Sequence, residues 1–182
     1  MSTTKIQENI QQNKELADFF DKQLDRTNYW LSFAEAKNGA LLAINVAIMA
    51  VLASVFDNAP VICTIALIFF IISCEACLLS FFPNVKSRPT NQNYKKKEDI
   101  NPNLLFFGDI AKMLSTEKYI ELSLSMYFAG KETVQYDKET YDLASEVLMN
   151  SRIAVQKYNV FKCAAKIDFV ALIVMVLFFV VA

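Results

Sequence analysis

The chain has no histidine and only three glycines among its 182 residues. These absences exclude histidine-based nucleophiles and the glycine-rich loops that cradle phosphate groups, and no nucleophile elbow is present. Catalysis by carboxylates alone stays open, but no spacing singles out a pair of acidic residues. We therefore expect a protein that is not an enzyme.

Positive charge is missing from two parts of the chain. Every Lys and Arg lies within 5–37 or 86–166, so the segment 57–60 and everything after Lys166 carry none. Lys and Arg are retained in the cytoplasmic loops of membrane proteins. We therefore expect the N-terminus inside the cell and the segment 57–60 and the C-terminus outside.

Long apolar runs are abundant, and hydrophobic residues make up 54% of the sequence. Two runs, 39–56 and 61–82, approach the roughly 20 residues that a helix needs to cross a hydrocarbon core about 30 Å thick. A third run occupies 169–182. These runs predict an all-α membrane protein containing a tight helical hairpin. The alternative, a soluble protein with buried hairpin helices, fits poorly with runs of this length.

The predicted organisation follows from the runs and the charges between them. It comprises an amphipathic cytosolic helix (1–37), a first transmembrane helix (38–56), an external loop (57–60), a second transmembrane helix (61–82), a cytosolic helical segment (83–164) and a third transmembrane helix (165–182). The first run begins too late for a signal peptide, so we expect no cleavable leader. The third offers only about 21 Å of apolar helix, which favours shielding by an oligomer.

The cytosolic segments carry helix patterns of their own. The first is not strongly basic, so we expect it to pack against later cytosolic helices or another subunit rather than lipid. Its apolar residues recur at helical spacing: Ile6, Ile10, Phe20, Leu24 and Leu31. Ser115 and Glu117 predict a helix start, with a stop at Gly130. No Gly or Pro occurs from Asp137 onward, which predicts one long helix that runs into the third span.

Three polar residues stand out in the predicted spans: Asn45, Glu75 and Asp168. An intramembrane carboxylate costs about 2.5 kcal/mol or more at the bilayer centre, and an amide can hydrogen-bond to another helix. All three are therefore candidates for polar or gating positions in the membrane. Glu75 has a second interpretation, in which it lies near the inner interface and pairs with Lys37 or Lys166.

Small residues and cysteines in the spans have simpler interpretations. The small residues fall on one face of the first span, where another helix can approach closely: Gly39, Ala43, Ala47 and Ala50. Cys74 and Cys77 have the C-x-x-C spacing of redox or metal sites, but no second pair accompanies them. We expect them to be buried apolar residues, and we expect no metal.

Two stretches carry a resemblance to a known family. One is 33–45, with the sequence FAEAKNGALLAIN, and the other is 103–110, with the sequence NLLFFGDI. Gly108 in the second stretch predicts a turn or a close approach. Together with the order of helix, hairpin, cytosolic segment and final span, they resemble the transmembrane effector family of Pycsar antiphage systems. The resemblance covers nearly the whole chain.

The resemblance implies a function in antiphage defence. In such a system a pyrimidine cyclase senses infection and makes cyclic CMP or cyclic UMP. The effector responds by impairing the bacterial inner membrane, so that the infected cell stops growing before phage matures. The expected partners are thus the cyclic nucleotide, membrane lipid, the cyclase as a functional partner and further copies of the chain, with no nucleic acid and no cofactor.

A site for a cyclic nucleotide needs cations or backbone donors for the phosphate and an aromatic or apolar face for the base. The candidate ligand-binding residues are Arg88, Lys95, Lys96, Lys97, Phe106, Phe107 and Arg152. For each the alternative is a solvated charge or a core aromatic, and the lysine cluster can also hold anionic lipid headgroups. The alternative function is a three-span sensor or scaffold that recruits partners without forming a pore.

Overall fold

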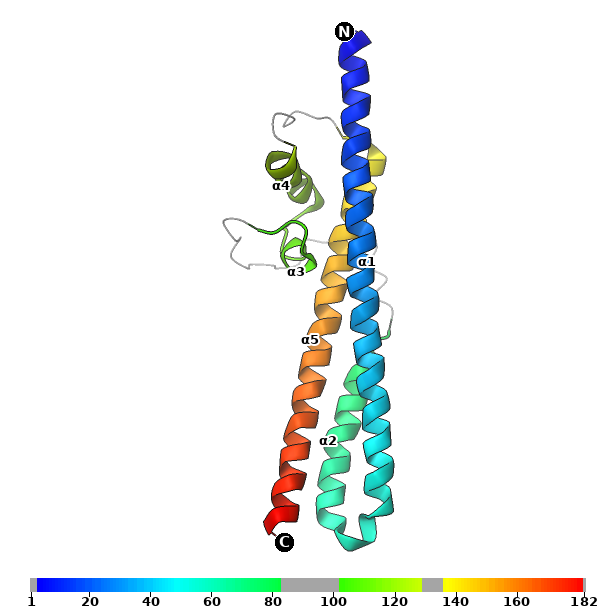
Figure 1. Cartoon of the computed structure of the whole chain (residues 1–182), viewed down its shortest axis with the longest axis vertical. Coiled ribbons are helices and arrows are strands. Elements are labelled where there is room, and N and C mark those ends of the chain that lie inside the picture. The colour runs from blue at the N-terminus through cyan, green and yellow to red at the C-terminus, as the bar shows by residue number, and fades with distance from the viewer. Residues whose placement is uncertain (1–2, 83–101, 129–135, 182) are drawn as a thin grey trace. The chain divides into compact units, whose positions relative to one another are not determined.

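The computed structural model describes residues 3–82, 102–128 and 136–181. Its elements (Figure 1) are α1 (Thr3–Ser54), the 3-10 turn η1 (Phe56–Asn58), α2 (Pro60–Leu79), α3 (Phe107–Ile110), α4 (Thr116–Tyr127) and α5 (Lys138–Val181). No strand occurs among these residues, which confirms the predicted all-α class.

The chain divides into two compact units, and each combines segments that are distant in the sequence. The first unit comprises Met1–Leu31 and Val85–Val155, and the second comprises Ser32–Asn84 and Gln156–Ala182. Helices α1 and α5 each contribute one part to each unit, whereas α3 and α4 belong to the first and α2 belongs to the second.

Both long helices are continuous. Helix α1 runs for 52 residues across the predicted boundary at residue 37, so the amphipathic segment and the first span are parts of one helix. Helix α5 has 44 residues, which confirms the prediction of a single long helix. The Asp137 carboxylate accepts a hydrogen bond from the Thr140 N–H at 2.9 Å, and this is the contact of an N-cap residue.

Two local predictions between the long helices are confirmed. The Ser115 side chain accepts a hydrogen bond from the Lys118 N–H at 3.2 Å and begins α4. A Cβ atom at Gly108 would lie 2.5 Å from Cε1 of Phe106, so this glycine marks a close approach. Helix α4 ends before Gly130, and this predicted stop lies outside the described residues.

The core of the first unit joins α1, α4, α5 and the α3 segment. Its buried residues are Leu16, Phe20, Leu104, Ile110, Met113, Tyr119, Ile120, Leu124, Ala144, Val147 and Leu148. Phe20 of α1 is fully buried, with its ring centroid 5.3 Å from that of Tyr119 on α4. The prediction that the N-terminal segment packs against later helices is therefore confirmed from Leu16 onward, whereas Ile10 is 64% exposed.

In the second unit, buried residues recur at intervals of seven on three helices that lie side by side in Figure 1. The recurring positions are Asn38, Asn45 and Leu52 on α1, Ser80, Ser73 and Ala66 on α2, and Lys157, Ala164 and Ala171 on α5. Hydrogen bonds join Asn38, Ser80 and Lys157 in one layer. Hydrogen bonds also join Asn45, Ser73 and Ala164 in the next layer. Leu52, Ala66 and Ala171 share one apolar cluster in the third. A seven-residue interval is the repeat of left-handed helix packing. The unit is thus a three-helix bundle built in layers, two polar and one apolar.

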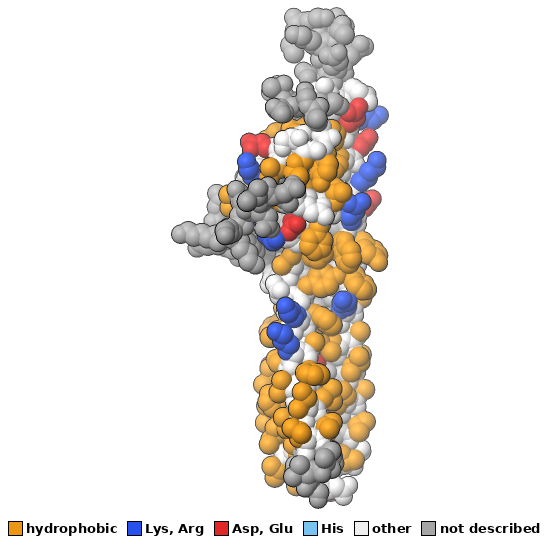
Figure 2. Space-filling model, turned by 60° about the vertical axis from the view of Figure 1, so that its left-hand side comes forward, with side chains coloured by type: hydrophobic (Ala, Val, Ile, Leu, Met, Phe, Trp, Pro, Cys, Tyr) orange, Lys and Arg blue, Asp and Glu red, His pale blue; other side chains and the backbone are white. Residues whose placement is uncertain are grey.

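The outward surface of the second unit is apolar. Large hydrophobic side chains are exposed along α2, including Ile65, Ile68, Ile71, Ile72, Leu78 and Leu79. Figure 2 shows hydrophobic side chains over most of the visible face of this unit. Two helical segments, Ile10–Ser54 and Pro60–Leu79, are long and apolar enough to cross a membrane. Within the described residues, the α5 segment is not among these candidate spans.

The first unit provides a test of its packing. Phe20→Ala should lower the free energy of unfolding by about 3–5 kcal/mol, because it removes a fully buried ring and leaves a cavity. Chemical unfolding of the full chain in detergent, followed by the fluorescence of its one tryptophan, Trp30, measures this loss. Ile10→Ala is the matched control, because Ile10 is exposed on the same helix. Equal stability of the two variants would contradict the assigned core.

Candidate functional site

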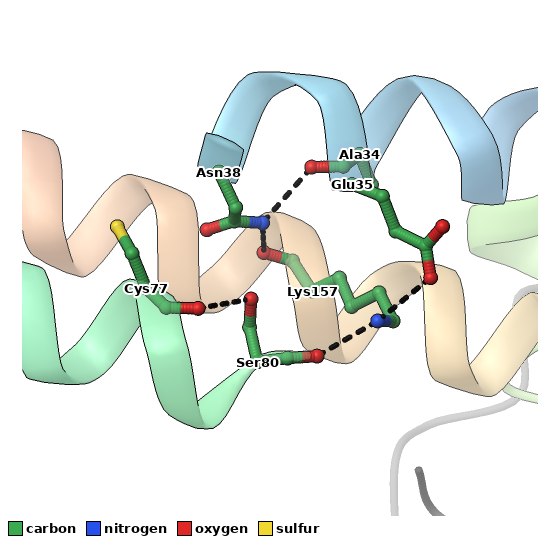
Figure 3. Close-up of polar contacts among 6 residues, drawn as sticks. All are labelled: Ala34, Glu35, Asn38, Cys77, Ser80 and Lys157. Carbon is green, nitrogen blue, oxygen red and sulfur yellow. Dashed lines mark hydrogen bonds and ion pairs between the residues drawn. The ribbon is translucent and has the colours of Figure 1, made fainter. Parts of the chain in front are cut away.

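The first polar layer of the second unit is organised by Lys157 of α5. This side chain is 11% exposed, and its ammonium lies 2.9 Å from the Glu35 carboxylate of α1 and 2.7 Å from the Ser80 carbonyl oxygen of α2. Figure 3 shows the ammonium directed between the two partners. The Phe81 ring lies below it, with its centroid 5.8 Å from Nζ. One cation therefore binds all three helices of the bundle.

Asn38 completes this layer from the first helix. Its side-chain amide donates to the Ala34 carbonyl oxygen of its own helix at 2.9 Å and to the Lys157 carbonyl oxygen of α5 at 3.2 Å (Figure 3). Asn38 is fully buried. Since a buried amide that loses its partners is costly, this pair of bonds fixes how α1 is rotated against α5.

The second polar layer is centred on Ser73 of α2. Its hydroxyl accepts a hydrogen bond from the Asn45 amide of α1 at 2.9 Å and donates to the Ala164 carbonyl oxygen of α5 at 3.4 Å. Asn45 and Ser73 are both fully buried. The structure thus places the predicted membrane residue Asn45 inside the bundle, where it hydrogen-bonds across helices as expected from the sequence.

Asp168 lies beside this second layer, one turn beyond Ala164 on α5. The residue is only 6% exposed, and neither carboxylate oxygen has a hydrogen-bond partner among the described residues. The carboxyl group of Asp168 lies near the thiols of Cys74 and Cys77 on α2, and the Asn45 amide also contacts Cys74. The structure therefore brings two of the predicted polar candidates, Asn45 and Asp168, to the same level of the bundle.

Glu75 has a different environment from the other two candidates. Its side chain is exposed on the outer face of α2, and it pairs with neither Lys37 nor Lys166 among the described residues. Lys37 instead lies against aromatic rings, with Nζ 4.8 Å from the Phe33 centroid and 5.5 Å from that of Tyr158. Within the described residues, the pairing that was one of two interpretations of Glu75 is not observed, and its role stays a prediction.

The predicted ligand-binding residues are only partly described. Arg88, Lys95, Lys96 and Lys97 lie outside the described residues. In the first unit, the Arg152 guanidinium donates to the Met113 carbonyl oxygen at 2.6 Å and to the Ala111 carbonyl oxygen at 3.3 Å. Arg152 thereby satisfies the carbonyl oxygens at and beyond the end of α3. This contact gives Arg152 a structural role next to the segment that carries Phe106 and Phe107.

The two aromatic candidates form a small cluster on the first unit. The ring centroids of Phe106 and Phe107 are 4.8 Å apart, and the Trp30 ring lies 5.7 Å from that of Phe107. Phe106 remains 45% exposed. An exposed ring beside a second ring offers the kind of face on which a base can stack. The structure thus groups Phe106, Phe107 and Arg152 around α3, and their roles in ligand binding stay predictions.

A side-chain hydrogen bond also joins α4 to α5 in the first unit. The Tyr141 hydroxyl donates to the Glu117 carboxylate at 2.9 Å. Together with the hydrogen bonds from Ser115 and from its own N–H, this contact lowers the pKa of Glu117, and the same bond raises the pKa of Tyr141. A carboxylate with a lowered pKa stabilises the fold above its ordinary pKa, and that contribution is lost as the pH falls through the lowered value.

Lys157, Ser73 and Ser80 are interior residues that were not predicted from the sequence. Each looked like an ordinary polar residue when its helix was considered alone. The signal that could have found them is the seven-residue interval shared by Asn38 and Asn45 and by Ser73 and Ser80. Two helices that carry polar residues at the same interval can pair them in register.

The Lys157 contacts predict that removing the carboxylate and removing the ammonium have unequal effects on the free energy of unfolding. Glu35→Ala should lower the free energy of unfolding by about 1–3 kcal/mol, because it leaves a buried ammonium without its countercharge. Lys157→Met should cost less, because an apolar side chain of similar length suits the interior and the Glu35 side chain is 46% exposed. The double variant should then unfold like Lys157→Met alone. Denaturant unfolding of the full chain completes the double-mutant cycle.

The control for this cycle is Lys162→Met, which removes an exposed lysine from the same helix. It should leave the free energy of unfolding unchanged within about 0.5 kcal/mol. Additive effects of Glu35→Ala and Lys157→Met would show that the two charges do not depend on each other.

Comparison with known proteins identifies a family. A family model for the Pycsar effector protein domain matches residues 19–182, which include all of the second unit and the first unit from residue 19 onward. No curated protein and no solved structure matches the chain. Since the match covers most of the 182 residues, the chain belongs to the Pycsar effector family.

Proposed function

We propose that this chain is an antiphage effector that responds to cyclic CMP or cyclic UMP by impairing the integrity of the inner membrane. The observation that carries the proposal is the match of the Pycsar effector domain to residues 19–182. The apolar outer surface of the second unit supports it, because exposed hydrophobic side chains in such number favour a lipid environment. The chain itself acts without catalysis.

The proposed topology has three spans, with the N-terminus inside and the C-terminus outside. Two candidate spans, in α1 and α2, support the hairpin. The third span is supported by packing, because Ala171 of α5 belongs to the same apolar cluster as Leu52 and Ala66. The absence of Lys and Arg from 57–60 supports the orientation. Because the third apolar run is short, its packing against the hairpin supplies the shielding that it needs.

We place the nucleotide site in the first unit. Of the residues expected from the sequence, Arg152, Phe106 and Phe107 belong to this unit, and an exposed Phe106 ring lies beside Phe107 there. Arg152 holds the α3 segment through the Ala111 and Met113 carbonyl oxygens. We propose that it shapes the site and that the basic residues of 88–97 meet the phosphate.

We also propose that copies of the chain associate through the second unit. Ala43, Ala47 and Ala50 of α1 are exposed on a face that the bundle itself does not use. Small side chains on an exposed face allow close approach of another transmembrane helix. The alternative function, a sensor or scaffold that recruits partners without opening a path, shares this topology and differs in the absence of any leak.

The first experiment tests the response to nucleotides. Liposomes holding the purified full chain should release a trapped dye and ions on addition of cyclic CMP or cyclic UMP, and not on addition of cyclic AMP or cyclic GMP. Phe106→Ala should shift the half-maximal nucleotide concentration upward by about tenfold, the loss of one stacked base. Leu105→Ala, also exposed in the same segment, is the control. If none of the four nucleotides causes release from liposomes in which the protein is inserted and folded, the scaffold function is supported instead.

The second experiment tests the orientation. In a Cys163→Ser background, which removes the exposed native thiol, Asn58→Cys should react with a membrane-impermeant maleimide in intact cells. Gln11→Cys, which is also exposed, should react only after the cells are permeabilised. Labelling of Gln11→Cys in intact cells, or protection of Asn58→Cys, would reverse the proposed orientation.

A further inference from the structure

The interior of the second unit contains acceptor oxygens without donors. Both oxygens of Asp168 and the side-chain oxygen of Asn45 are buried and have no hydrogen-bond partner among the described residues. Asp168 is 6% exposed and Asn45 is fully buried. Leaving a carboxylate in such a place without a partner is costly, and buried charges in proteins are therefore paired or coordinate metal ions. The amide oxygen of Asn45 needs a hydrogen-bond donor, and the carboxyl group of Asp168 needs a proton or a positive partner.

Among the described residues, no cationic side chain of this unit pairs with Asp168. Lys37 lies against aromatic rings, and Lys162 is exposed. The Lys157 ammonium is held by Glu35 and Ser80, and it lies eleven residues, or about 16 Å of helix, before Asp168. Lys166 is exposed, and residues two apart on a helix do not face each other. The buried carboxyl group of Asp168 is thus left without a cationic partner among the described residues of its own bundle.

The neighbouring groups at this level are polar and suited to a metal ion. The Ser73 hydroxyl lies between Asn45 and the Ala164 carbonyl oxygen, at 2.9 Å and 3.4 Å. Asp168 follows Ala164 by one turn, and its side chain is directed back along the helix, as side chains in α-helices are. Carboxylate, amide, hydroxyl and carbonyl oxygens from three helices are therefore available at one depth.

We propose that Asp168 and Asn45 bind one dehydrated alkali cation, Na⁺ or K⁺, inside the three-helix bundle. A single carboxylate balances one positive charge, whereas Ca²⁺ takes six to eight oxygen ligands and is held by several carboxylates. Glu75 does not take part, because it is exposed on the outer face of α2. This inference rests on the proposed membrane function, because that function places the bundle within the bilayer. It adds an ion-binding position between the three helices.

Thermal unfolding of the full chain in lipid nanodiscs, without nucleotide, tests the site. The ionic strength is kept constant with N-methylglucamine chloride while NaCl or KCl replaces it. The melting temperature of the wild type should rise by roughly 5–10 °C at a hundredfold excess of cation over the dissociation constant. An equal melting temperature in all three salts would overturn the proposal, and a response to pH alone would identify a proton as the ligand and overturn it too.

Two substitutions locate the effect. Asp168→Asn should remove the dependence on Na⁺ and K⁺ because it removes the charge that the ion balances. Asp57→Asn should keep the dependence, because Asp57 is an exposed carboxylate of the same unit. Retention of the full cation effect in Asp168→Asn would assign the ion to another place. Asn45→Asp, which adds a second carboxylate, should extend the response to Ca²⁺.

Equilibrium dialysis of the wild type against ²²Na⁺ covers the case in which Asp168→Asn does not fold. A parallel dialysis against ⁸⁶Rb⁺, which stands in for K⁺, covers the other cation. About one ion bound per chain is expected in at least one of the two, and no bound ion in either would overturn the proposal whatever the variants do. These measurements need neither nucleotide nor leakage. Cation binding without nucleotide-dependent release would therefore reject the effector proposal and leave the ion site in place, and the reverse result would reject the ion site alone.

Discussion

The buried ammonium of Lys157 is the interaction on which the second unit depends. It reaches a carboxylate on α1 and a carbonyl oxygen on α2 from its place on α5, so no helix can rotate without breaking one of these contacts. In a bilayer, expulsion of water does not hold helices together, and polar contacts and close packing have to do so. In the next layer along the bundle, Asn45 of α1 hydrogen-bonds to Ser73 of α2, so neutral groups join the helices there. Two polar layers thus set the register for an otherwise apolar bundle.

Much of the fold could be predicted from the sequence, because its strongest signals are local. The hairpin follows from two apolar runs around a short polar segment, and the uninterrupted α5 follows from the lack of Gly and Pro after Asp137. The Ser115 cap and the close approach at Gly108 are equally local. The division into two units was not predictable in this way, since it depends on which face of each long helix meets a distant segment.

The candidate site was less predictable, because burial of a polar group depends on three helices at once. Asn45 and Asp168 were identified from their place in apolar runs, yet Lys157 looked like a solvated charge of a cytosolic helix. Glu75, the most unusual residue by sequence, is exposed on the outer surface. Arg152 was expected to meet a ligand, and its observed partners are backbone carbonyl oxygens of its own unit. In each case the sequence shows the neighbouring residues along the chain, but it does not show which residues of the other helices lie beside them.

The layered spacing also constrains how the length of these helices can change. One residue inserted into α2 between Ala66 and Ser73 would turn the rest of the helix by about 100°. Ile72 and Leu79 would then occupy the interior places of Ser73 and Ser80. The second polar layer would lose the Ser73 hydroxyl that joins Asn45 to Ala164. An insertion of seven residues would preserve the face but lengthen the helix by about 10 Å. Length differences among members of this family are therefore expected in the connections, while the three helices of the bundle keep a common length.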